Sequence, residues 1–415
     1  MSRPVSEARR VAASASTLAF FQVIGMLLPL LTLPVLARAL GVELFGQIML
    51  AQFVVLFGVV FIDAGFNVES QRKVALATDD HGRLQVLLDN LMARSLLACV
   101  VILAILGVGV LTPGLPMWMV GIALLHLAGT LLFPQWWFIA REEGLRMGLA
   151  STAGRLISAG LILWLVRSPS DAGIALLAAS SATLLSGLMV LPGLWRALRA
   201  HADALDWRGY RGFMRSVRPM ILSGFVASSA QSVPTVVLGW VSGPLQVGLF
   251  SAAERLTRAG GHVSGVMGLS LLNVAARMHR DGHHDMQQTG YWVLRWTAGM
   301  CLAGSLLLAL LAETVVRLLY GAHFVDSVLV LQVLAMWLGL YVFRGIWVML
   351  HWRALGLLTQ VSRIQWQEGM SVFVVSLLGG WLLGARGVAA GLVVSELGLL
   401  LRLYLFYRQT SGATS

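Results

Sequence analysis

The feature that most constrains the fold of this chain is a series of apolar runs, each about as long as a helix that crosses a membrane. Such a helix needs about 20 apolar residues. Charged residues make up only 12% of the 415 residues, against about 25% in an ordinary soluble domain. The sequence therefore predicts an all-α polytopic membrane protein with no large soluble domain. Twelve transmembrane helices are predicted, at residues 14–37, 45–64, 91–112, 116–139, 148–166, 172–195, 219–241, 247–274, 293–312, 328–351, 366–384 and 387–407.

The basic residues predict how these helices are oriented. Of the 30 Lys and Arg residues, four lie between the runs on one side of the membrane, and 23 lie in or next to segments on the other side. Cytoplasmic segments are enriched in Lys and Arg, so the second side is predicted to be cytoplasmic, with both termini there. The net charge of +11 is spread over short segments and forms no basic face, which excludes nucleic-acid binding. The four outside residues are Arg38, Arg167, Arg317 and Arg386.

A short motif occurs twice, half a chain apart. Gly41, Gly46 and Ala51 are spaced like Gly243, Gly248 and Ala253, with an offset of 202 residues. Six helices per half give both halves the same orientation, as in transporters built from parallel repeats. We therefore expect two pseudo-symmetric six-helix lobes around a central cavity, with residues 1–200 forming the N-terminal lobe and residues 219–415 the C-terminal lobe.

The segment between the predicted lobes, residues 201–218, has the pattern of an amphipathic helix. The apolar residues Trp207, Tyr210, Met214 and Val217 recur at helical spacing, and so do the arginines at positions 208, 211, 215 and 218. A helix with one apolar and one basic face is typical of the membrane interface, where its cations meet anionic lipid. We expect this segment to lie in the headgroup layer.

Several charged residues fall inside the predicted helices, where a charge costs at least about 2.5–3.5 kcal/mol. Some of them are spaced to form structural pairs, Asp63 with Arg94 and Glu254 with Arg258, and His126 fits a packing role. As a group, the arginines predict a cavity between the lobes that binds a lipid- or sugar-linked anion, because a guanidinium group suits phosphate oxygens. The predicted substrate-binding residues are His126, Arg255, Arg258 and Arg344, and the predicted coupling-ion residues are Asp63, Glu254 and Glu396.

No catalytic or metal-binding motif accompanies these charges. The chain has no P-loop, no His-Glu-x-x-His and no Gly-x-Ser-x-Gly, which argues against a nucleotide-driven pump, a zinc protease and a serine hydrolase. His279, His283, His284 and Asp285 are interpreted as a solvated polar loop rather than a metal site. We expect a transporter that uses no cofactor, no metal and no catalytic residue.

Four patches of sequence, in order along nearly the whole chain, resemble O-antigen and related polysaccharide flippases of the multidrug/oligosaccharidyl-lipid/polysaccharide exporter superfamily. They are Leu33–Gly41 with Phe45-Gly46, Asp63-Ala-Gly65-Phe-Asn67 with Arg72, Pro134-Gln-Trp-Trp-Phe138 with Glu142, and Leu318-Leu-Tyr-Gly-Ala-His-Phe324. The resemblance adds Arg38 as a substrate-binding position. It also marks Gly41, Gly46, Gly65, Asn67 and Arg72 as family positions. Trp240 stands where the second half would need a counterpart of Arg38.

The resemblance implies a flippase that moves undecaprenyl-pyrophosphate-linked oligosaccharide repeat units across the bacterial inner membrane by alternating access. It implies as partners the bilayer, a polysaccharide polymerase and a chain-length regulator. A proton or sodium gradient would supply the driving force.

Other functions stay open. One is a cation-coupled multidrug antiporter of the same superfamily, which would need acids rather than arginines in its cavity. Another is a lipid II flippase, which usually has more than twelve spans. A third is a membrane polymerase or glycosyltransferase, whose catalytic residues would lie in a long outside loop; the longest one predicted here is 313–327.

Overall fold

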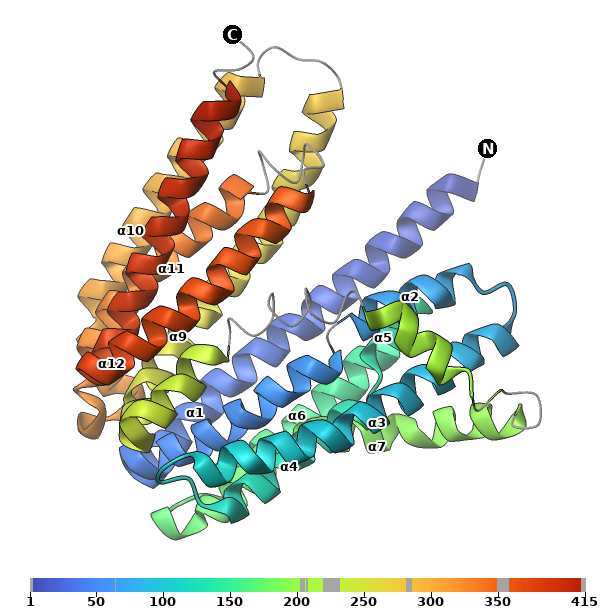
Figure 1. Ribbon diagram of the computed structural model, residues 1–415, viewed down its shortest axis with the longest axis horizontal. Coiled ribbons are helices and arrows are strands. Elements are labelled where there is room, and N and C mark those ends of the chain that lie inside the picture. Colours follow the sequence, from blue (N-terminus) through green and yellow to red (C-terminus); the bar gives the residue numbers. More distant parts are fainter. Residues whose placement is uncertain are drawn as a thin grey trace. The chain divides into compact units, whose positions relative to one another are not determined.

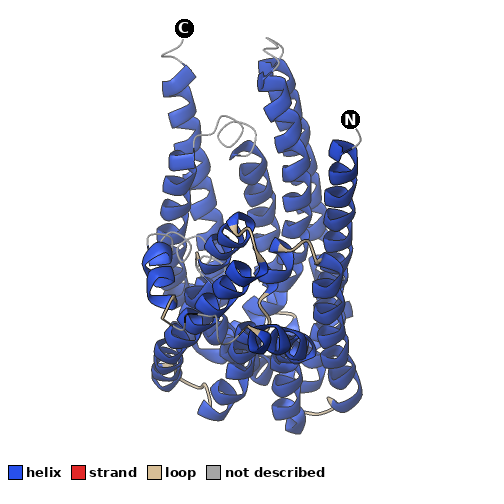
Figure 2. Ribbon diagram, turned by 90° about the vertical axis from the view of Figure 1, so that its right-hand side faces the viewer, coloured by secondary structure: helices blue, strands red, loops and turns tan. Residues whose placement is uncertain are grey.

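The structure, a computed structural model, describes residues 3–63, 65–201, 206, 208–218, 232–280, 286–348 and 358–411 (Figures 1 and 2). The chain divides into two compact units, Met1–Ser232 and Val233–Ser415. Within the described ranges the secondary structure is entirely helical, which confirms the predicted all-α class. The first unit contains α1 (Arg3–Asp63), α2 (Phe66–Leu76), α3 (Asp80–Leu111), α4 (Met117–Leu132), α5 (Gln135–Ala140), α6 (Gly144–Leu165), η1 (Pro169–Asp171) and α7 (Ala172–Ala200). The second contains α9 (Val233–Arg280), α10 (Met286–Tyr320), η2 (Ala322–Phe324), α11 (Ser327–Val348) and α12 (Leu358–Ser411).

Three of these helices, α1, α9 and α12, are more than twice as long as the hydrocarbon core of a membrane is thick, and each is bent at a glycine. As a straight rod the 61 residues of α1 would extend about 90 Å, against about 30 Å of hydrocarbon core. The backbone leaves the helical conformation at Gly41 (φ 75°, ψ 174°), at Gly243 in α9 (φ 80°, ψ 176°) and at Gly384 in α12 (φ 59°). In Figure 1 the chain turns back at the lower-left end of α1. These glycines lie where the sequence predicts short turns between helices.

Nine helices within the described ranges are long and apolar enough to cross a membrane. α1 and α12 have enough residues on both sides of Gly41 and Gly384 for each to supply two crossings, whereas the described part of α9 before Gly243 is too short for one. The number twelve itself stays a prediction. Residues 219–231, where the seventh helix is predicted to begin, and residues 349–351 of the tenth lie outside the described residues.

The structure differs from the predicted boundaries at two places. The predicted outside loop 313–327 is mostly helical, because α10 continues to Tyr320 through the ion pair of Glu313 with Arg317, one helical turn apart. The fourth predicted helix is interrupted at Phe133-Pro134, where proline has no N–H to continue the ladder of hydrogen bonds.

The helices pair in the same way in both units. In the first unit α1 packs against α4 and α6, α3 packs against α4, and α4 packs against α7. In the second, α9 packs against α11 and α12, α10 against α11, and α11 against α12. The two schemes match when α1, α3, α4 and the pair α6–α7 are aligned with α9, α10, α11 and the two halves of α12. This correspondence and the similar backbone angles of Gly41 and Gly243 support the duplication inferred from the sequence.

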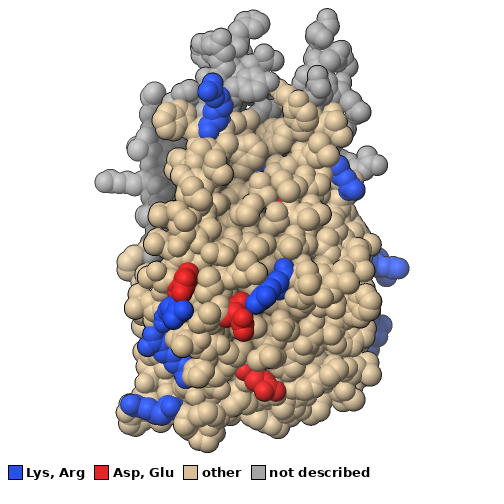
Figure 3. All heavy atoms as spheres, turned by 90° about the vertical axis from the view of Figure 1, so that its left-hand side faces the viewer, with Lys and Arg blue, Asp and Glu red and all other residues tan. Residues whose placement is uncertain are grey.

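The outer surfaces of the helices are apolar. Side chains that a soluble protein would bury, including Trp164, Leu310 and Trp381, are each more than 70% exposed. Charged side chains are sparse on the face shown in Figure 3. Large contiguous apolar surfaces on soluble proteins mark contact sites, and on helices of this length they face lipid. The chain is therefore a multi-pass membrane protein.

Residues 208–218 belong to the first unit, and their apolar face packs against α2 and α3 rather than pointing to lipid as the sequence predicts. Phe213 and Val217 are buried against Phe66 of α2 and Ala93 of α3. Lys73 of α2 donates a hydrogen bond to Ser216 Oγ (3.0 Å). The apolar face is thus covered by protein, whereas the arginines on the opposite face are exposed. The predicted boundaries 1–200, 201–218 and 219–415 stay a prediction, and Trp207 lies outside the described residues.

We expect Gly41→Ala to lower the free energy of unfolding by about 1–3 kcal/mol, because its backbone conformation is almost exclusive to glycine. An added Cβ at Gly41 meets no atom within 4 Å, so the effect comes from the backbone alone. Gly107→Ala in α3 is the matched control, since its Cβ also meets nothing within 4 Å and its backbone is helical. Thermal unfolding in detergent micelles measures both variants, and equal stability would contradict this account of the turn.

Candidate functional site

Three charged residues lie together on the second half of α9. Glu254 is buried, and Arg258, one turn later, donates a hydrogen bond from Nη2 to Glu254 Oε1 (2.6 Å). Thr235, on the first half of α9, donates from Oγ1 to Glu254 Oε2 (3.4 Å). The Glu254 carboxylate therefore connects the two halves of α9 across the Gly243 bend. The pairing of Glu254 with Arg258 that the sequence suggests is present.

Arg255 follows Glu254 on the same helix. Its Nε atom is buried, and its charge lies close enough to Tyr320 of α10 to interact with it electrostatically. Arg255 and Arg258 also lie within electrostatic range of each other. With Glu254 as the neighbouring acid, this stretch of α9 carries two guanidinium groups and one carboxylate.

A second cluster joins α11 to both halves of α12; we name it the Arg344 cluster, after Arg344, Glu368 and Glu396. Arg344 Nε donates a hydrogen bond to Glu396, and Arg344 Nη2 donates to Glu368 Oε1 (2.8 Å). Arg344 and Glu396 are buried, and the Glu368 side chain is 19% exposed. Beside them, Tyr341 lies with its ring centre 5.3 Å from the Arg344 guanidinium carbon.

The Arg344 cluster contains two carboxylates and one guanidinium group, so it has one acidic group in excess. Isolated buried charge is costly, and excess negative charge of this kind favours binding of a proton or a small cation. Glu368 was not predicted as a site residue, although an acid near the start of the predicted helix 366–384 is a usable signal. Arg258 lies within electrostatic range of Tyr341, which brings the α9 charges and the Arg344 cluster into one neighbourhood of the second unit.

Asp63 and Arg94 form a separate pair in the first unit. Arg94 is buried, donates to Asp63, and also donates from Nε to the carbonyl oxygen of Ile62 (3.2 Å) and from Nη2 to that of Thr130 (3.4 Å). One guanidinium group thus joins the ends of α1, α3 and α4. Its partners are all groups of the protein, which is the arrangement of a structural connection.

The remaining predicted substrate residues lie in the first unit. His126 of α4 contacts Thr183 Oγ1 of α7 through Nδ1 (3.4 Å), a contact between two packed helices. Arg38 is exposed, three residues before the Gly41 bend.

The family positions shape the turns around α1 and α2. Gly46 is buried beyond the Gly41 bend, and Gly65 adopts φ 79° where α2 begins. Asn67 is half-buried in the first turn of α2. Arg72 makes two hydrogen bonds of 2.8 Å to the buried Glu69. Arg72 thus has a partner within α2, and Gly41 and Gly65 shape the turns that position α1 and α2.

His283, His284 and Asp285 lie outside the described residues. In the part of the chain that is described, no group of three or more His, Cys, Asp or Glu residues is arranged to hold a metal ion.

Comparison with protein families identifies the family. The family described as "Polysaccharide biosynthesis protein" matches residues 11–272, more than half of the chain. The chain belongs to this family. The resemblance inferred from the four sequence patches is thereby confirmed.

Two relatives of this polysaccharide biosynthesis protein each carry the name "Putative O-antigen transporter". The relative from Escherichia coli (strain K12) is 30% identical over 256 residues, which are 58% of this chain and 59% of that protein. The relative from Shigella dysenteriae is 24% identical over 240 residues, 56% of this chain and 59% of that protein. The matched region thus spans about three fifths of the length of these relatives.

Two solved structures share the fold. One is an inward-facing multidrug resistance MATE family transporter of the MOP superfamily (TM-score 0.73, 18% identity, covering 93% of this chain and 95% of that one). The other is the lipid II flippase MurJ in an inward closed conformation (TM-score 0.74, 12% identity, covering 94% of this chain and 87% of that one). At these identities the likeness shows the fold alone.

We expect Arg344→Gln to lower the free energy of unfolding by about 3–5 kcal/mol, because it leaves the buried Glu396 and the partly buried Glu368 without their cation. Arg317→Gln is the matched control, since it breaks an exposed Arg–Glu pair and costs about 1 kcal/mol or less. Adding Glu368→Gln and Glu396→Gln to Arg344→Gln recovers most of the loss. Thermal unfolding of the purified variants measures these differences. Equal effects of Arg344→Gln and Arg317→Gln would contradict the ionic account of the cluster.

Proposed function

We propose that this protein is a flippase that translocates polyprenyl-pyrophosphate-linked oligosaccharide, such as O-antigen or exopolysaccharide repeat units, across the bacterial inner membrane. The observation that carries the proposal is membership of the polysaccharide biosynthesis family. Two further findings support it: the curated relatives are named as transporters, and the fold is shared with a lipid II flippase. Both termini are proposed to be cytoplasmic. A polysaccharide polymerase and a chain-length regulator are the proposed partners.

The charges on α9 suit the headgroup of such a substrate. A pyrophosphate presents several anionic oxygens, and guanidinium groups bind them through paired N–H donors. Arg255 and Arg258, beside a single carboxylate, give this part of the second unit an excess of positive charge. We propose that these two arginines contact the pyrophosphate or an acidic sugar. Arg38 and His126 are secondary candidates for contact with the sugars.

The Arg344 cluster is the proposed coupling site. Asp63 and Glu254 each pair with one arginine, whereas the Arg344 cluster has a carboxylate in excess. A proton or sodium ion bound there would neutralise the excess charge. To drive transport, the ion must bind one conformation more tightly than the other. We propose alternating access of the substrate site to the two leaflets, with the polyprenyl chain remaining in lipid.

The shared fold with a multidrug transporter also favours a second candidate, cation-coupled export of small molecules. An organic cation would need acidic partners. The excess of arginine over acid on α9 makes this candidate weaker than an anionic substrate.

We expect the double variant Glu254→Gln/Arg258→Gln, and separately Arg255→Gln, to lower surface polysaccharide about tenfold or more in cells that depend on this protein, since each loses a charged contact to phosphate. The double variant keeps a hydrogen-bonding pair in the buried site and so avoids an unpaired charge. Arg317→Gln, which removes a charge from an exposed pair, is the control. Immunoblotting of the membrane fraction checks that every variant is inserted. A normal amount of surface polysaccharide with both α9 variants would contradict the assignment of these arginines to substrate binding.

We also expect Glu368→Gln to fold normally, because it leaves the Arg344–Glu396 pair intact, and to remove the response of transport to an ion gradient. Glu313→Gln, at an exposed ion pair, is the control. Transport is measured in proteoliposomes with and without an imposed proton or sodium gradient. An undiminished gradient response in Glu368→Gln would overturn the coupling assignment and leave the substrate assignment standing.

A further inference from the structure

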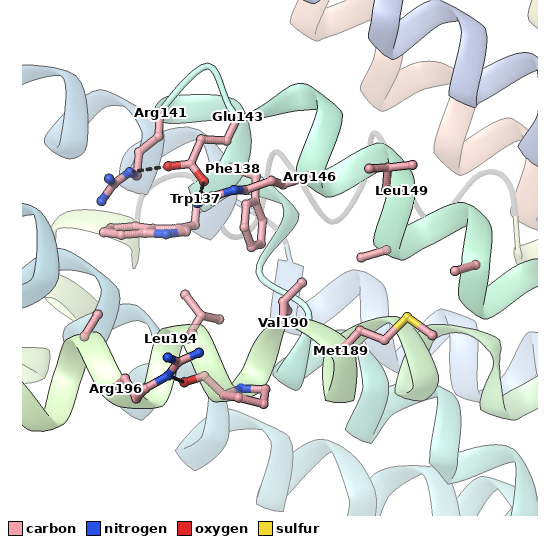
Figure 4. A pocket seen from close by; sticks show the side chains of 15 residues that line it. Trp137, Phe138, Arg141, Glu143, Arg146, Leu149, Met189, Val190, Leu194 and Arg196 are labelled. Atoms are coloured by element: carbon pink, nitrogen blue, oxygen red, sulfur yellow. Dashed lines mark hydrogen bonds and ion pairs between the residues drawn. The ribbon is translucent and has the colours of Figure 1, made fainter.

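A pocket of about 690 Å³ lies wholly within the first unit, between the α5–α6 turn and the last part of α7 (Figure 4). α6 begins at Gly144 and α7 ends at Ala200, so the pocket is at the end of two candidate membrane-spanning helices. This is the level at which the hydrocarbon core meets the lipid headgroups, on the side predicted to be cytoplasmic. Ligand sites commonly have volumes of about 300–1,000 Å³. The pocket is therefore large enough for a lipid headgroup and its glycerol.

The charged lining of the pocket is basic. It contains three arginines, Arg141, Arg146 and Arg196, and one acid, Glu143. Glu143 lies between two of the arginines, accepting from Arg141 Nε (2.9 Å) and from Arg146 Nη1 (3.0 Å). Arg196 donates from Nε to the carbonyl oxygen of Pro192 (3.1 Å). Each of these contacts uses one N–H, and a guanidinium group has five, so the arginines retain donors for an anion.

The local backbone holds these groups in place. The Arg141 guanidinium lies 5.2 Å from the ring centre of Trp137, a cation–π contact with a buried ring. Glu142, between Arg141 and Glu143, has φ 58°, an uncommon conformation for a residue other than glycine. The N–H of Glu143 donates to the carbonyl oxygen of Phe138 (2.8 Å), which closes the turn. The cationic side of the pocket is thus formed before any ligand arrives, which lowers the entropic cost of binding.

The opposite part of the lining is apolar. Met189 and Val190 of α7 and Leu149 and Ala153 of α6 line it, and Figure 4 shows Leu149 and Met189 away from the arginines. Leu149 and Met189 are about half exposed, on helices that cross the membrane. A free phosphate would use the arginines alone. A lipid uses both parts, with its phosphate at the arginines and an acyl chain along the apolar wall.

We propose that this pocket binds an anionic glycerophospholipid of the cytoplasmic leaflet, with its phosphate between Arg141, Arg146 and Arg196 and an acyl chain against Leu149 and Met189. The lipid would join the start of α6 to the end of α7. This inference does not depend on the proposed transport function, because it concerns the first unit alone and a component of the membrane itself. It also gives a role to the Trp-Trp-Phe patch, since Trp137 and Phe138 line the same pocket.

The test is a lipid titration of the purified full chain in detergent micelles, with thermal unfolding and native mass spectrometry as readouts. Dioleoylphosphatidylglycerol is the probe and dioleoylphosphatidylcholine the neutral comparison. We expect the anionic lipid to raise the unfolding temperature more than the neutral one does. Arg196→Gln should weaken its binding about tenfold or more, through loss of charge-assisted contacts to phosphate. Arg199→Gln should not, because Arg199 is an exposed arginine of the same helix that does not line the pocket.

A second variant tests the pocket without changing any charge. Gly193 lines the pocket, and an added Cβ there meets no atom within 4 Å, so Gly193→Leu places a side chain in the empty space. We expect it to abolish stabilisation by phosphatidylglycerol while the unfolding temperature in phosphatidylcholine stays the same or rises. Gly160→Leu, in α6 and outside the pocket, is the control, since its Cβ also meets nothing within 4 Å.

Four outcomes would overturn the proposal. They are no preference for phosphatidylglycerol over phosphatidylcholine, equal weakening by Arg196→Gln and Arg199→Gln, full binding to Gly193→Leu, and displacement of the lipid by inorganic phosphate or undecaprenyl phosphate at equal concentration. Any of the first three would mean that the anionic lipid does not bind in the pocket, or that it is attracted only by the overall basic surface. The last would assign the pocket to a soluble anion or to a polyprenyl lipid.

Discussion

The structure depends on the pairing of buried guanidinium and carboxylate groups within bundles of otherwise apolar helices. A charge inside such a bundle is tolerated only where an opposite charge or a polar backbone group meets it. Arg94 satisfies this requirement with Asp63 and two carbonyl oxygens, and so connects three helices of the first unit. In the second unit the same chemistry is not balanced pair by pair. α9 carries an excess arginine and the Arg344 cluster an excess acid, and the proposed substrate and coupling sites rest on this difference.

Much of the fold could be predicted from the sequence because its determinants are local. Apolar runs of membrane-spanning length predict the helices, and glycine marks the bends at Gly41, Gly243 and Gly384. The ion pair of Glu254 with Arg258 follows from helical spacing, and Asp63 and Arg94 lie at neighbouring ends of consecutive predicted helices. Arg344 and Glu396 are 52 positions apart in the sequence, so their contact cannot be predicted from the spacing of residues within one helix. The pocket between α6 and α7 was not predicted for the same reason, since its walls come from residues 137–153 and 189–197, which are far apart in the chain.

The basic segment 208–218 shows how the same pattern fits two environments. Its alternation of apolar and basic residues predicts a helix at the membrane interface, with its apolar face in lipid. In the structure that face is covered by α2 and α3, and Phe213 is buried against Phe66. An apolar face is removed from water equally well by protein and by lipid, so the periodicity of the sequence alone does not distinguish the two environments. The arginines remain exposed in either case.

The central claim is that the protein moves an anionic, lipid-linked oligosaccharide from one leaflet to the other. The most direct measurement uses proteoliposomes that contain the purified chain and an undecaprenyl-pyrophosphate-linked oligosaccharide distributed over both leaflets. An impermeant glycosidase outside the vesicles reports how fast the sugar appears there. The account predicts rapid cleavage of nearly all the sugar with the native protein, and only the outer-leaflet fraction in protein-free vesicles. Cleavage confined to the outer-leaflet fraction with the native protein, under both proton and sodium gradients, would contradict it.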